Sequence, residues 1–149
     1  MELKTIEVIK PTVSVPFKDR IIATLYYPYM VYHIKVTIRR ILGDSSYLHG
    51  FVVVDLTRAL VFLADSLPKT FTVEVPLNTI IPERIDEDRA TKLAKKKMVY
   101  VAMRKFKLML SPKVDVIEKK KVYKQFWLVK LNDKNYIIDS LTGESEEVV

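Results

Sequence analysis

The chain contains one pattern twice: an apolar strand, a turn, and a second apolar strand that ends on aspartate. In the first copy, residues 30–36 (Met-Val-Tyr-His-Ile-Lys-Val) precede residues 51–55 (Phe-Val-Val-Val-Asp) and a Thr-containing turn. In the second, residues 126–131 precede residues 136–139 (Tyr-Ile-Ile-Asp), then Ser-Leu-Thr-Gly-Glu. Because a repeated unit constrains architecture before chemistry, this internal repeat predicts two related β-meanders.

The hydrophobic period changes at residue 86 and predicts one long helix. Apolar residues recur at three- and four-residue spacing from Ala90 to Met109, after an acidic start and before Ser111-Pro112. We therefore expect an α+β protein: an antiparallel sheet of two related β-meanders with one long helix, about 86–110, packed on it. It is expected to be a single domain, 1–149, either undivided or built of a strand-rich half (1–76) and a helix-plus-meander half (85–149).

Alternating apolar residues between turn signals predict the strands. They are expected at 3–9, 30–41, 47–55, 60–64, 71–75, 114–117, 122–131 and 136–139, with a short acidic strand at the end. Residues 14–25 are expected to form a short helix or a loop. The charged residues 118–121 are expected to form an exposed turn between two strands.

Composition excludes several classes of protein. Without cysteine, the chain has no disulfide framework, thiol nucleophile or cysteine-ligated metal site. The charged N-terminus and the absence of a run of roughly 18 apolar residues favour a cytoplasmic protein with no membrane span. Abundant Ile, Val, Lys and Tyr with three glycines are typical of a thermophile. No catalytic or phosphate-loop motif is present, so we expect no enzyme and no cofactor.

Two carboxylates and two histidines are the residues that would carry chemistry. Asp55 and Asp139 end equivalent strands, but a Thr-containing turn follows each, so they are expected to fix turns rather than act as an acid–base pair. His33 and His49 could pair across their hairpin. No ligand spacing accompanies them, so no metal site is expected, and a metal-dependent enzyme around His33, His49 and Asp55 is the least favoured alternative.

The densest aromatic cluster is a candidate interaction surface. It consists of Tyr26, Tyr27, Tyr29 and Tyr32. Alternation around Pro28 places two tyrosines on each side of the strand, so one pair is expected in the core and the other at an exposed surface. Strand edges here, or at the C-terminal strand, could then pair in a homodimer. The alternative is a core and rim cluster that closes the sheet.

The net charge of +7 is concentrated in one segment. Residues 86–124 hold thirteen Lys or Arg against five Asp or Glu. The candidate phosphate contacts there are Lys95, Lys96, Lys97, Arg104, Lys105, Lys107, Lys119, Lys120, Lys121 and Lys124. Such a surface would bind nucleic acid through counterion release. The alternative is an ordinary solvated helix face.

The second half resembles a PepSY-type domain. The resemblance rests on Ile85-Asp-Glu-Asp-Arg-Ala90-Thr-Lys-Leu-Ala94, on the aromatic and apolar strand 123–131, and on Tyr136-Ile-Ile-Asp139-Ser-Leu-Thr142-Gly143-Glu144. It covers roughly 85–149. Residues 26–64 match the strand portion only, with Ala59 in place of the turn glycine. The resemblance implies a non-catalytic binding, chaperone-like or inhibitory module.

Two functions are therefore predicted. The favoured one is a small non-enzymatic interaction or assembly module, with an unknown protein or a second copy as its partner. The alternative is a nucleic-acid-associated protein that binds the phosphate backbone through the basic helix and the residues after it.

Overall fold

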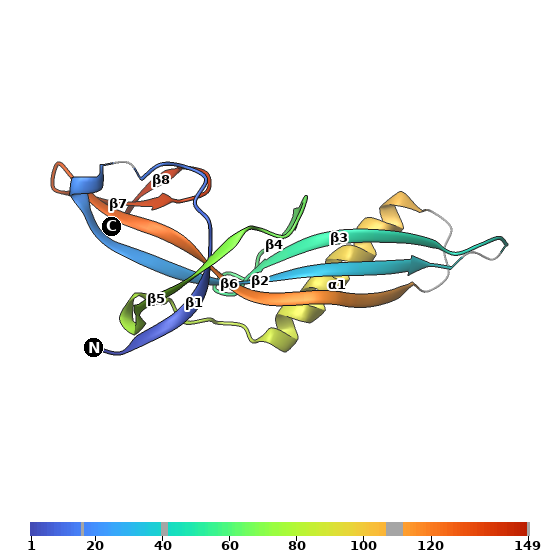
Figure 1. Ribbon diagram of the computed structural model, residues 1–149. Coiled ribbons are helices and arrows are strands. Elements are labelled where there is room, and N and C mark those ends of the chain that lie inside the picture. Colours follow the sequence, from blue (N-terminus) through green and yellow to red (C-terminus); the bar gives the residue numbers. More distant parts are fainter. Residues whose placement is uncertain (16, 40–41, 107–111, 149) are drawn as a thin grey trace. The chain divides into compact units, whose positions relative to one another are not determined.

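The computed structural model is α+β, with one long helix and a mixed sheet of eight strands (Figure 1). It describes residues 1–15, 17–39, 42–106 and 112–148. The elements are β1 (Leu3–Ile9), β2 (Ile21–Ile38), β3 (Ser46–Asp55), β4 (Val61–Ala64), β5 (Thr70–Pro76), α1 (Glu87–Lys105), β6 (Lys113–Leu131), β7 (Lys134–Asp139) and β8 (Ser145–Val148), with 3₁₀ turns at Lys18–Arg20 and Leu77–Thr79. The predicted fold class is confirmed.

The chain divides into two compact units, each assembled from separate segments. The first unit comprises Met1–Pro28, Pro68–Glu83 and Val122–Val149. The second comprises Tyr29–Leu67 and Arg84–Lys121. Strands β2 and β6 each run from one unit into the other. The units therefore do not coincide with the consecutive segments 1–76 and 85–149.

In the second unit, α1 packs across one face of an antiparallel meander. Strands β2, β3 and β4 follow one another in the sheet, and the start of β6 follows β2 on the other side. The core consists of alternate strand residues and one helix stripe: Met30, Tyr32, Ile34, Val36 and Ile38 of β2, Val52 and Val54 of β3, and Ala90, Ala94, Met98 and Ala102 of α1. The even-numbered residues of this part of β2 therefore face the helix, and the odd-numbered ones face away.

Local chemistry explains where α1 begins and ends. The Asp86 carboxylate accepts a hydrogen bond from the Arg89 backbone N–H at 2.8 Å and caps the first turn. Acidic residues occupy that turn and basic residues the last, which complements the helix dipole. Phe106 already has an extended conformation, so the helix is shorter than the predicted 86–110. Residues 107–111 lie outside the described part of the chain.

The first unit contains parallel pairing as well as antiparallel pairing. Strands β1 and β5 pair antiparallel along their whole length, and β6, β7 and β8 form an antiparallel meander. Strands β1 and β6 pair in parallel at Val8 and Tyr123. The prediction of an entirely antiparallel sheet was wrong here. A parallel pair needs a long connection, and residues 10–112 supply it.

Two local predictions were also wrong. Within the described residues 14–15 and 17–25, Lys18–Arg20 is the only helical stretch and β2 begins at Ile21, so the segment is neither a helix nor a loop throughout. Residues 118–121 are not a turn but exposed residues inside the continuous strand β6. The charged run interrupts the apolar pattern without ending the strand, and its side chains remain exposed to solvent.

Gly50 permits the close approach of α1 to β3. A Cβ at this position would overlap Sδ and Cε of the buried Met98 side chain. We expect Gly50→Ala to lower the free energy of unfolding by about 1–3 kcal/mol through overpacking. In a Met98→Ala background, which removes the overlapping atoms, the same substitution should cost less than about 1 kcal/mol. Urea unfolding of the four proteins measures this coupling, and strictly additive costs would contradict it.

Candidate functional site

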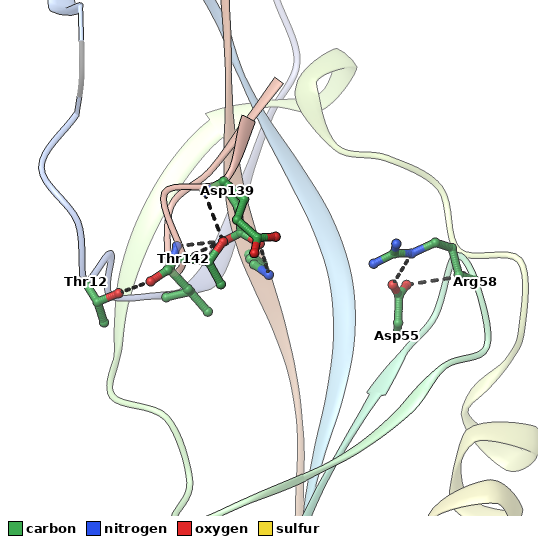
Figure 2. Close-up of polar contacts among 8 residues, drawn as sticks. Thr12, Asp55, Arg58, Asp139 and Thr142 are labelled. Carbon is green, nitrogen blue, oxygen red and sulfur yellow. Dashed lines mark hydrogen bonds and ion pairs between the residues drawn. The ribbon is translucent and has the colours of Figure 1, made fainter. Parts of the chain in front are cut away.

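Asp55 and Asp139 occupy equivalent turns, one in each unit (Figure 2). The Asp55 Oδ1 atom accepts hydrogen bonds from the backbone N–H groups two and three residues later, at 2.9 and 3.2 Å. The Asp139 Oδ1 atom accepts the corresponding bonds at 2.8 and 3.2 Å. Each aspartate also donates its own backbone N–H to the carbonyl five residues later, at 2.8 and 2.9 Å. The prediction that both carboxylates fix turns is confirmed.

The remaining carboxylate oxygens bind cations. Asp55 Oδ2 lies 2.8 Å from Arg58 Nε, and Asp139 Oδ2 lies 2.6 Å from Lys124 Nζ. Burial on its own raises the pKa of each aspartate. The hydrogen bonds from Thr57 and Arg58, and those from Lys124 and the turn N–H groups, outweigh that effect and hold both pKa values below the ordinary 3.8. Both carboxylates are therefore ionised, and their oxygen atoms are used to fix the turns and to bind the cations.

The tyrosine cluster does not form an exposed surface. Tyr29 and Tyr32 are buried, and the Tyr32 hydroxyl lies 3.0 Å from Thr91 Oγ1 beneath α1. Tyr26 and Tyr27 are half-buried in the first unit, where the Tyr27 ring packs edge-on against Phe126 at 4.7 Å between centroids. The interaction-surface prediction was wrong for Tyr29 and Tyr32. Tyr32 belongs to the face of β2 under the helix, and Tyr29 lies beside the Asp55 turn.

Most of the predicted basic residues are exposed in the second unit. Lys95, Lys96, Arg104 and Lys105 are exposed on α1, and Lys97 is half-buried. Lys119, Lys120 and Lys121 are exposed on β6, where Lys119 Nζ lies 3.2 Å from Glu87 Oε1. Lys107 lies outside the described residues. Lys124 was predicted wrongly, because its ammonium is largely buried against Asp139 in the first unit.

The histidines pair across the β2–β3 hairpin, as their positions suggested. His33 Nε2 lies 2.9 Å from His49 Nδ1, and the His33 ring stacks on Phe51 at 4.9 Å between centroids. Lys35 Nζ lies 4.3 Å over the Tyr47 ring, on the same side of the sheet. The sequence interpretation missed Tyr47 and Phe51. Their signal is the alternation of Tyr47, His49 and Phe51 along one strand.

Two further features bear on function. Within the described residues, no three His, Asp or Glu side chains gather as candidate metal ligands. None of the described helices has the length and apolar character needed to cross a membrane.

The two aspartate turns differ at the residue with positive φ. Ala59 has φ 58°, whereas Gly143 at the equivalent position has φ 76°. An L-residue in this region is strained by about 1–2 kcal/mol. We expect Ala59→Gly to raise the free energy of unfolding by about 1 kcal/mol, and the matched Gly143→Ala to lower it similarly. A Cβ at Gly143 would meet only ordinary contacts with Val13, so backbone strain alone is tested. Thermal unfolding measures both, and destabilisation by Ala59→Gly would contradict the strain.

Stability should depend on the Asp139 carboxylate at neutral pH and lose that dependence in acid. A lowered pKa contributes stability above the unfolded value of about 3.8, and this contribution disappears as pH falls through the folded value. Asp139→Asn should therefore cost about 3 kcal/mol at pH 7, because it leaves Lys124 partly buried without its counter-charge. The difference in free energy of unfolding between the unmodified protein and Asp139→Asn should narrow below about pH 4. Asp44→Asn, in an exposed loop, is the control, and a pH-independent difference for Asp139→Asn would refute the carboxylate's role.

Comparison with family models, curated proteins and solved structures found no match for this chain. The resemblance of residues 85–149 to a PepSY-type domain therefore stays a prediction.

Proposed function

We propose that this protein is a non-enzymatic binding module whose partner is nucleic acid, bound through the phosphate backbone by the second unit. The observation that carries the proposal is the concentration of positive charge. The second unit holds 17 Lys or Arg against 8 Asp or Glu, whereas the first holds 8 against 10. A unit with a net charge of +9 attracts a polyanion and releases its counterions on binding.

The exposed side of α1 supports this proposal. Between Arg89 and Lys105 the helix has no acidic residue. Lys96 lies on the side of the helix opposite the buried alanine stripe, and Lys95 and Lys97 flank it. Among the described residues, no ion pair occupies these three lysines. Their charges are therefore available to phosphate groups.

Replacing Lys95, Lys96 and Lys97 together with Gln tests the proposal. Binding to an oligonucleotide of about 16 nucleotides should weaken about tenfold or more at low salt. The slope of log affinity against log salt should also become shallower, by roughly 0.7 to 0.9 for each phosphate that the variant no longer neutralises. Fluorescence anisotropy at several salt concentrations measures both quantities.

The matched control removes the same charge elsewhere. Lys4, Lys10 and Lys130 are exposed lysines of the first unit, and their replacement with Gln should leave the salt slope unchanged. Equal losses of affinity in both triple variants would show that only total charge matters. Absence of any binding by the unmodified protein at low salt would refute nucleic-acid binding itself.

A further inference from the structure

The sheet face opposite α1 carries several aromatic and histidine rings, which binding through charge alone does not require. Because the even-numbered residues of β2 lie under the helix, His33, Lys35 and Thr37 project from the other face. The antiparallel register places Phe51, His49 and Tyr47, respectively, across from them. Among the described residues of the second unit, no helix lies on this face.

These rings are accessible rather than packed away. Tyr47 is 58% exposed, His49 is exposed, and Phe51 and His33 are half-buried. Contacts link them into a continuous surface, from Phe51 to His33 at 4.9 Å and from His33 to His49 at 5.1 Å between centroids. The hairpin thus holds the rings in place before any ligand arrives, which reduces the entropy lost on binding.

The charge of the second unit, with two cations beside the rings, favours an anionic ligand. Within residues 29–38, β3 and β4, the charged residues are Lys35 and Asp55, and Asp55 is buried and bound to Arg58. Arg39, exposed directly after β2, adds a second cation. The β2–β3 hairpin of this face therefore presents aromatic rings beside cations. The carboxylates near them are the exposed Asp44 of the hairpin loop and the half-buried Asp115 of β6, which lies between two residues that pack under α1. The second unit as a whole carries a net charge of +9, which favours an anionic ligand. Bases stack on rings while phosphates contact neighbouring cations, which is how proteins hold single strands.

We infer that this face binds single-stranded nucleic acid, with unpaired bases stacked on Tyr47, His49 and Phe51 and the backbone near Lys35. The inference rests on the proposed function and adds the class of ligand. Outward residues along a strand recur about every 7 Å, close to the length of one nucleotide in an extended strand. A duplex keeps its base faces stacked internally, so it cannot use this surface.

The two histidines provide a direct test, because they are the only ones in the chain and both lie on this face. We expect titration with a single-stranded oligonucleotide, DNA or RNA, to shift both histidine ring signals in NMR spectra of the full chain. The same sequence as a duplex should shift them less. Tight binding with unmoved histidine signals would overturn the inference and leave the proposed function intact. No binding at low salt would instead refute the proposed function.

Substitution of the exposed ring provides the second test. Tyr47→Leu should weaken single-strand binding at least about fivefold, the lower range for loss of one stacked base, while Tyr47→Phe retains the ring and should retain the affinity. The matched control is Tyr100→Leu, since Tyr100 is 55% exposed on α1 and thus on the other layer. Circular dichroism checks that each variant folds. Equal affinity of Tyr47→Leu and Tyr47→Phe, or equal losses of affinity for Tyr47→Leu and Tyr100→Leu, would overturn the stacking role.

Discussion

The second unit depends on the buried carboxylate of Asp55. By accepting the turn N–H groups it fixes the direction in which the chain leaves β3 for β4. The carbonyl of the next residue, Leu56, accepts hydrogen bonds from the N–H groups of Arg84 and Ile85 at 2.9 and 3.2 Å. These residues lead directly to the Asp86 cap of α1. The turn at the end of β3 is therefore tied by two hydrogen bonds to the segment that leads into α1.

The same arrangement in the first unit receives a different segment. The carbonyl of Ser140, which follows Asp139, accepts the N–H groups of Thr12 and Val13 at 3.1 and 3.3 Å. What differs is the counter-charge: Arg58 comes from the turn itself and is exposed, whereas Lys124 comes from β6 and is largely buried. The same turn geometry therefore occurs with an exposed cation in the second unit and with a largely buried one in the first. A buried carboxylate needs several donors wherever they originate, because its desolvation is costly.

Sequence reasoning succeeded where a signal was local. Apolar alternation and the Asp–Thr turns predicted the meanders, and the four-residue apolar period predicted α1. It failed where the outcome depends on a partner strand or layer. The charged residues 118–121 continue β6 because Val114 and Val116 before them pack on the core of the second unit, and the residues after them pair with β1 and β7. The rings of β3 were missed because Tyr47, His49 and Phe51 alternate with Leu48, Gly50 and Val52, and only the position of α1 decides which set is covered.

In the second unit, the lysines of α1 and the rings of β2 and β3 lie on opposite layers. A helix is about 10 Å across, so charges on its outer side act on the ring face from beyond one Debye length of about 8 Å at physiological salt. They can attract a polyanion at low salt but cannot hold its backbone against the rings. On that face, the cations that can contact the phosphates are Lys35, which lies over Tyr47, and Arg39. Because stacking needs contact and is little screened, raising salt should remove helix-dependent binding first. The residual binding at high salt then reports the ring face alone.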